Sequence, residues 1–221
     1  MEWRDDAFIL TVRPYGDTAA IATLLTREHG RHAGLVQGGQ GRRMQAVLQP
    51  GTRVLAAWRS AQAERLGAFT LEAQPGGQVA ALFADPLRLC ALQSACALAG
   101  AALPEREAQP GMFEATEALM TALEGDAWAE TYVMWERGLI GLLGYAFEGQ
   151  AEIPVPGFLR GAGGGGCAEV LDGLRLTGYF LEHHVFAVMH MPVPAARQRF
   201  VESYHAAFGS EQGSTPASPG A

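Results

Sequence analysis

Residues 7–17 read AFILTVRPYGD, an apolar and β-branched run that ends in turn-forming residues. This composition predicts a β-strand closed by a turn. Similar short runs, each bounded by turn residues or glycine, predict four more strands at 18–26, 32–36, 46–58 and 67–73. We expect the fourth to bend at Pro50-Gly51, because proline inside a run marks an edge or a bulge. Five short strands within about 70 residues, without a long helix between them, predict a small closed or partly closed barrel.

The hydrophobic pattern changes from Gln78 onward. Apolar residues now recur three and four positions apart, and alanine and leucine replace β-branched residues, as is typical of helices. Helices are therefore predicted at 79–102, 112–123, 128–145, 168–189 and 193–208. A Gly/Pro-rich connector is expected at 147–166, and a disordered polar tail at 209–221.

The two halves together predict an α+β fold. Residues 1–76 are expected to form an N-terminal OB-fold β-barrel, since that barrel matches the size and strand count. Residues 77–208 are expected to form an all-helical C-terminal domain. Three cysteines are an odd number, and Cys90 and Cys96 lie in an apolar helical stretch, which favours core thiols in a reducing cytosol. No run of about 18 apolar residues occurs, so we expect a cytoplasmic protein without a membrane partner.

The charge is distributed unevenly. The chain has a net charge of −7 and contains no lysine. Residues 1–75 hold nine Arg against seven Asp plus Glu, whereas residues 76–221 hold seven Arg against sixteen acids. Phosphate contacts need clustered cations. The barrel half is therefore the better candidate for a phosphate surface, and the acidic half for water or a protein partner.

No motif for catalysis or for a cofactor is found. The chain has no nucleophile elbow, phosphate loop or zinc-protease spacing, so we expect no enzyme and no cofactor. The glycines at 161–166 follow no strand of a βαβ unit and are better explained as a linker. His183, His184 and His190 share a predicted helix without further ligands at matching spacing. Amphipathic surface is the preferred interpretation of these histidines, and metal binding the minor alternative.

Several strings resemble a known family. The order Arg13-Pro14-Tyr15-Gly16-Asp17-Thr18, Leu25-Thr26-Arg27-Glu28-His29-Gly30-Arg31 and Leu48-Gln49-Pro50-Gly51 resembles the N-terminal OB domain of RecO proteins. Trp135-Glu136-Arg137-Gly138-Leu139-Ile140-Gly141-Leu142-Leu143-Gly144-Tyr145 resembles a helix of their C-terminal domain, and residues 176–201 are similar to the closing helices. The resemblance covers most of the chain at the expected domain layout.

The resemblance implies a mediator of DNA repair and recombination. Such a protein would bind single-stranded and duplex DNA, anneal complementary strands and help to place RecA on gaps, near the nucleoid. It would have two direct protein partners, RecR and the C-terminal tail of single-strand-binding protein. These implications come from the resemblance and not from composition or periodicity.

Two departures from the family pattern are visible. Many members carry a four-cysteine zinc site after the helix that ends near Tyr145, whereas that region is short here and holds only Cys167. One thiolate does not make a structural zinc site, so no metal is expected in this shortened form. The loop after the third strand is less basic than is usual in the family, with Gln37, Gln40, Arg42 and Arg43, which predicts weaker DNA affinity.

The residues expected to contact nucleic acid lie in the barrel half. They are Arg13, Arg27, Arg31, His32, Arg42, Arg43, Arg59 and Arg65. Arg42 and Arg43 stand out because glycines before them would let the backbone approach phosphates. Tyr15, Trp58 and Phe69 are possible stacking platforms, although Trp58 and Phe69 are more readily explained as core.

In the helical half, Arg88 and Arg137 are expected to bind a partner. An acidic tail with a hydrophobic end needs an apolar groove with a basic rim, to which four further arginines could contribute. They are Arg160, Arg175, Arg197 and Arg199. Two alternatives stay open: a repair adaptor with little DNA affinity of its own, and an OB-fold protein that binds RNA through its 2′-hydroxyls.

Overall fold

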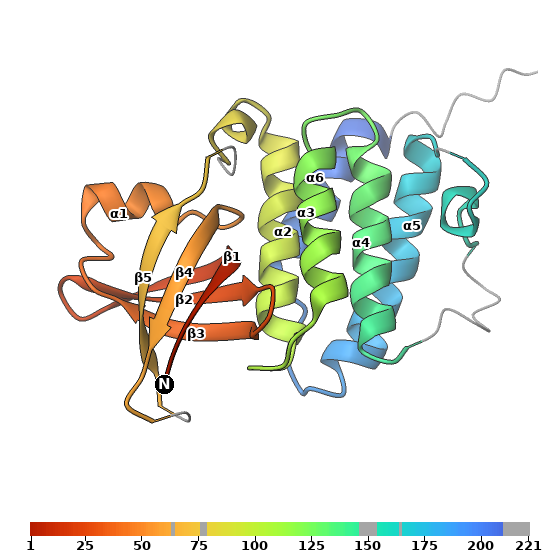
Figure 1. Cartoon of the computed structure of the whole chain (residues 1–221). Coiled ribbons are helices and arrows are strands. Elements are labelled where there is room, and N and C mark those ends of the chain that lie inside the picture. The colour runs from red at the N-terminus through yellow and green to blue at the C-terminus, as the bar shows by residue number, and fades with distance from the viewer. Residues whose placement is uncertain (63–64, 76–78, 146–153, 164, 210–221) are drawn as a thin grey trace, which may run out of the picture.

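The computed structural model describes residues 1–62, 65–75, 79–145, 154–163 and 165–209. A β-barrel and a stack of helices lie side by side (Figure 1). Five strands, β1 (Glu2–Tyr15), β2 (Ala19–Thr26), β3 (Gly30–Val36), β4 (Arg53–Arg59) and β5 (Gly67–Ala73), close in the order β1-β2-β3-β5-β4. Only β3 and β5 pair in parallel. The short helix α1 (Arg42–Val47) lies between β3 and β4, so the predicted OB-fold barrel is confirmed.

β1 closes the barrel by pairing with two strands. Its first half pairs with β4 and its second half with β2, and the register with β2 shifts between Ile9 and Thr11. This bulge leaves Leu10 and Thr11 both against Gly100 of the helical half. A Cβ on Gly100 would lie 3.1 Å from Thr11 Cγ2 and 3.7 Å from Leu10 Cβ, so a helix approaches the strand closely at this point.

The prediction of one long strand at 46–58 is wrong. Residues 42–47 form α1, which packs Met44 and Val47 against the barrel core, and β4 starts only at Arg53. Gly51 has a φ of +88°, and its N–H donates to Ile9 O at 2.7 Å. A strand does not continue through that left-handed turn. The apolar run around Val47 was too short for its period to separate helix from strand.

Helices after α1 form the second layer. They are η1 (Val79–Ala84), α2 (Pro86–Ala102), α3 (Pro110–Ala122), α4 (Trp128–Leu142), α5 (Cys167–Phe180) and α6 (Ala195–Phe208). A short 3-10 turn, η2 (Gly157–Arg160), precedes α5, and a π-helical turn, η3 (Leu181–Phe186), extends it. Cys96 is buried and Cys90 is partly buried, both in α2.

The predicted helix at 79–102 is two elements. Asp85 Oδ1 accepts hydrogen bonds from the N–H groups of Leu87 and Arg88, both at 3.1 Å, and Pro86 occupies the first helical position. This capping arrangement starts a new helix at Pro86. Of the predicted connector at 147–166 and tail at 209–221, residues 146–153, 164 and 210–221 lie outside the described part of the chain.

The two halves share a core. Phe8, Leu10 and Leu25 point outward from β1 and β2 and join the same buried apolar cluster as the residues of α2 to α6. Polar groups border this seam. Arg53 pairs with Asp6 and with Glu117 of α3, and Arg27 pairs with Glu117 at 3.6 Å. The barrel is therefore fixed to α2 and α3 by apolar contact and by ion pairs together.

One charged pair lies inside the helical half. Glu136 of α4 is 0% exposed, and Arg197 of α6 donates to it from Nε at 2.7 Å and from Nη2 at 3.0 Å. Thr177 and Tyr132 also donate to the Glu136 carboxylate. Burial alone would lower the pKa of Arg197, but the charge and hydrogen bonds of Glu136 outweigh it and raise that pKa. Within this buried cluster, each of the two charges is compensated by the opposite charge of the other.

The barrel interior holds a cluster of aromatic rings. Trp3, His32, Trp58 and Phe69 contact one another, with ring centroids 4.8 to 6.4 Å apart. Trp58 and Phe69 are buried, as expected. His32 is 5% exposed, and neither of its ring nitrogens has a hydrogen-bond partner. Burial, reinforced by the positive charge of Arg106, lowers the pKa of His32 to about 4.

Replacing Arg197 with methionine should strongly destabilise the protein. The Arg197→Met variant leaves the Glu136 carboxylate buried without its cation, which costs about 3–5 kcal/mol in the free energy of unfolding. Urea denaturation measures the loss. The double variant Glu136→Gln/Arg197→Met removes both charges and should recover much of it. A single variant as stable as the wild type would contradict this account of the pair.

His32 should make the protein sensitive to acid. In the unfolded chain it takes up a proton near pH 6.5, and in the folded chain only near pH 4. The contribution of neutral His32 to stability is therefore complete above pH 6.5 and is lost as the pH falls to 4, by up to about 3 kcal/mol. His32→Phe should remove this part of the pH dependence, as urea denaturation at a series of pH values would show. Parallel profiles for the two proteins would contradict it.

Candidate nucleic-acid interface

A shallow hollow of about 410 Å³ lies on the barrel between two of its loops. Tyr15, at the end of β1, lines it together with residues 59–61, at the end of β4, and residues 65–66, before β5. Leu35 of β3 and Ala68 of β5 form the floor, where these two strands pair in parallel. OB barrels bind oligonucleotides on the face between the loop after the first strand and the loop after the fourth. This hollow occupies that place.

The hollow combines cations with an aromatic ring. Arg59 and Arg65 line it and are exposed, and Tyr15 is 55% exposed. Arg59 contacts Glu2 at 3.2 Å, with the arginine side chain 76% exposed. An ion pair that exposed contributes little, so Arg59 can exchange Glu2 for a phosphate. Guanidinium groups beside an exposed ring suit a nucleic-acid backbone with stacked bases.

The segment between α2 and α3 also reaches this region. Residue 105 forms a parallel bridge with Arg31 of β3, and the N–H of Arg106 donates to Arg31 O at 2.8 Å. The Arg106 side chain then donates from Nη2 to Arg65 O at 3.2 Å. Arg106 therefore connects the helical half with the loop that carries Arg65.

Arg106 was not among the residues expected from the sequence. It lies in what the pattern predicts to be a spacer between helices, and it adopts a φ of +59°. Gly30 accommodates the segment, since a Cβ there would lie 1.8 Å from Glu107 O. No local signal identifies Arg106, because its position depends on the docking of residues 103–107 against β3.

Two expected contacts, Arg31 and His32, are not on an open surface. Arg31 donates from Nε to Leu103 O at 2.6 Å and pairs with Glu105 at 3.5 Å, with only 19% of its side chain exposed. His32 points into the barrel. Neighbouring residues of a strand face opposite sides, so the two could not share one DNA contact. The structure thus shows both side chains in other surroundings, and their contact with nucleic acid stays a prediction.

Arg27 also has a structural position. Its guanidinium lies 4.3 Å from the centre of the Phe113 ring and pairs with Glu117, both of α3. It therefore belongs to the seam between the halves, and its expected role in DNA contact stays a prediction. Arg13 is exposed on β1, and its side chain faces the same side of the strand as Tyr15.

Arg42 and Arg43 are exposed, but they begin α1 and are not part of an extended glycine loop. The loop before them contacts the loop after β1. Gln40 donates from Nε2 to Gly16 O at 2.8 Å and to Ala19 O at 3.0 Å, which fixes the loop after β1. Because Gln40 lies against that loop, the first turn of α1 starts close to the Tyr15 side of the hollow.

The expected partner residues do not gather at one place. Arg88 donates from Nη1 to Leu123 O at 2.7 Å and pairs with Asp85, so it joins α2 to the end of α3. Arg137 is exposed and donates from Nη1 to Leu159 O at 2.9 Å. Arg175 and Arg197 line a groove between α5 and α6, and none of the other four arginines of the expected basic rim does.

The described residues hold no group of three or more His, Cys, Asp or Glu side chains that could bind a metal ion. His184 is partly buried beside Tyr145, Tyr179 and Phe180, and its Nε2 atom has no hydrogen-bond partner. Cys167 begins α5. None of the helices in the described part of the chain has both the length and the apolar composition needed to span a membrane.

Comparison with known proteins places the chain in a family. The model "Recombination protein O N terminal" matches residues 1–73, and "Recombination protein O C terminal" matches residues 84–153. The DNA repair protein RecO of Rhodospirillum centenum is 47% identical over 251 residues, covering 98% of this chain and 100% of the relative. The RecO protein of Rhodospirillum rubrum is 38% identical, covering 91% of this chain and 96% of its own length. That of Phenylobacterium zucineum is 41% identical, covering 89% of this chain and 95% of its own length. The OB barrel, the helical layer and these matches agree, and the chain belongs to the RecO family of DNA repair proteins.

Proposed function

We propose that this protein is a DNA repair and recombination mediator that binds single-stranded and duplex DNA on the barrel. The observation that carries the proposal is the hollow in which Tyr15, Arg59 and Arg65 meet on the oligonucleotide-binding face of an OB barrel. The family membership supports a role in DNA repair. Such a role is one of binding and requires no group that makes or breaks a covalent bond.

The mechanism is capture of the DNA backbone by arginines. Arg59 and Arg65 contact phosphates, Arg106 holds the loop that carries Arg65, and one base stacks on Tyr15. Arg13, Arg42 and Arg43 extend the cationic surface on the Tyr15 side. Backbone capture leaves most base edges free for pairing, which is what annealing of complementary strands requires. Binding of this kind depends strongly on salt and weakly on sequence.

The partners belong to the same proposal. RecR and the acidic tail of single-strand-binding protein are proposed to bind directly, and RecA is assisted indirectly. Arg137 is the more exposed of the two expected partner residues. Both donate to main-chain carbonyls, Arg137 to Leu159 O and Arg88 to Leu123 O.

One observation favours an adaptor with little DNA affinity of its own. Three barrel arginines, Arg27, Arg31 and Arg53, are engaged in contacts with the helical half. They therefore contribute little to an open cationic surface, and the excess of Arg over Asp plus Glu in the barrel half is already small. An adaptor would retain the partner contacts and show no binding of oligonucleotides even at low salt. An RNA-binding protein would prefer RNA when matched RNA and DNA oligonucleotides compete.

Fluorescence anisotropy with a labelled single-stranded oligonucleotide across a salt series tests the arginines. Arg59→Ala/Arg65→Ala should lower the affinity roughly tenfold and reduce the slope of log K against log salt by about 1.4, as two lost phosphate contacts predict. The matched control Arg160→Ala/Arg199→Ala changes the net charge equally in the helical half and should have little effect. Arg42→Ala/Arg43→Ala tests whether α1 belongs to the site. Equal losses in the first pair and the control would contradict the placement.

Tyr15→Ala should separate stacking from charge. Loss of one base–aromatic stack lowers affinity by about 1–3 kcal/mol while the salt slope stays unchanged. Tyr15→Phe keeps the ring and should bind like the wild type. If Tyr15→Ala binds as tightly as the wild type, the ring does not hold a base.

A further inference from the structure

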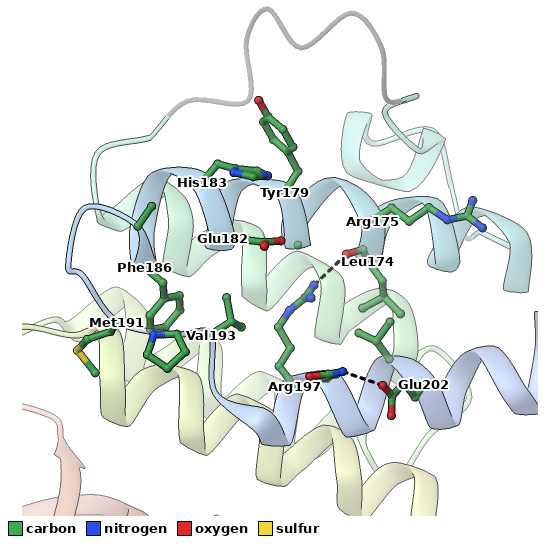
Figure 2. Close-up of a pocket in the computed structure, with 15 residues that line it drawn as sticks. Leu174, Arg175, Tyr179, Glu182, His183, Phe186, Met191, Val193, Arg197 and Glu202 are labelled. Carbon is green, nitrogen blue, oxygen red and sulfur yellow. Dashed lines mark hydrogen bonds between the residues drawn. The ribbon is translucent and has the colours of Figure 1, made fainter.

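A second hollow, of about 850 Å³, lies in the helical half. It runs between α5 with its π-helical turn on one side and α6 on the other (Figure 2). In the π-helical turn, the N–H of Ala187 donates to Glu182 O, five residues back, at 3.1 Å. Such turns are rare and are often found at functional sites. The DNA-binding proposal makes no use of this groove.

The groove is lined largely by apolar side chains. Leu174 and Phe186 are buried in its wall, and Val193 and Val201 are partly buried. Met191, which also lines the groove, is 46% exposed. Exposed apolar side chains around a hollow indicate a binding surface, and methionine adapts readily to a partner.

The charges of the groove leave a negative excess. Arg175 pairs with Asp172 at 2.7 Å. Arg197 is neutralised by Glu136, as described above. Glu182 on the α5 side and Glu202 on α6 also line the groove. Glu202 accepts a hydrogen bond from Gln198 at 2.9 Å, but within the described residues neither carboxylate is recorded in an ion pair. Figure 2 places these two carboxylates on the two opposite walls.

One buried donor is also available to an occupant. Arg197 lines the groove and is 8% exposed, and its recorded hydrogen bonds use Nε and Nη2. A Cβ on Gly178 would lie 3.0 Å from Nη1, so glycine at this position leaves room beside that nitrogen. Nη1 can therefore donate to a main-chain carbonyl of a bound segment.

We propose that this groove binds an amphipathic, positively charged segment of a protein partner. Apolar side chains of the segment fill the hollow, and its Lys or Arg side chains contact Glu182 and Glu202. Charge complementarity is what selects this occupant, because an acidic segment would face two unpaired carboxylates. The groove is thus distinct from a site for an acidic tail, and the inference does not depend on DNA binding by the barrel.

Fluorescence anisotropy of the full chain with two labelled peptides tests the proposal. One is a helical peptide with Leu and Phe on one face and Lys along both flanks, and the other is identical except that Glu replaces every Lys. The Lys peptide should bind the more tightly. Glu182→Gln/Glu202→Gln should weaken it roughly tenfold. Met191→Ser should weaken it through the apolar contact alone.

The control addresses general attraction to an acidic protein. Glu114 and Glu124 are exposed and lie outside the groove. The variant Glu114→Gln/Glu124→Gln therefore changes the net charge by the same amount as Glu182→Gln/Glu202→Gln. This pair should bind the Lys peptide like the wild type, and oligonucleotide binding should be unchanged in every variant. Tighter binding of the Glu peptide, no binding of either peptide, or an equal loss in the control pair would each overturn the proposal.

Discussion

The contact between the barrel and the helical layer determines which charges this protein can present. The apolar part of this contact is made by side chains of the barrel that pack in the helical core, namely Phe8, Leu10 and Leu25. Ion pairs of Arg27 and Arg53 with Glu117 border it. Arginines at such a seam stabilise it and lose most of their access to solvent. Arg59 and Arg65 remain exposed at the hollow, and they are the ones proposed to bind DNA.

The strands and helices were largely predictable because their periods are clear. The helix carrying Tyr132 and Trp135 places apolar residues on one face, and the strand ending at Tyr15 contains a continuous apolar run that is buried on both faces. The prediction for 46–58 was wrong because it joined the end of a helix and a strand, both short and apolar, across Gly51. The sequence does not reveal the left-handed conformation of Gly51. Local pattern therefore predicts elements well and their junctions poorly.

The candidate site was predictable only in part. Arg59 and Arg65 follow the end of β4 and lie in the hollow, as a loop of a nucleic-acid-binding barrel would. The position of His32 could have been inferred from alternation, since Val36 and His32 are an even number of residues apart on β3 and both face inward. The positions of Arg31 and Arg106 could not be inferred in this way, because Arg106 contacts Arg31 across 75 residues of sequence.

The bulge in β1 has a consequence for how this chain can vary. Before it, Ala7 and Ile9 face the barrel interior, and after it Val12 does, so the alternation shifts by one residue. That shift turns Arg13 and Tyr15 outward. A substitution that removed the bulge without changing the length of the strand would continue the alternation from Ile9 and direct the Tyr15 ring into the barrel. A strand one residue shorter, by contrast, would keep Val12 inward and Tyr15 outward, so shortening at this point is compatible with the hollow and flattening is not.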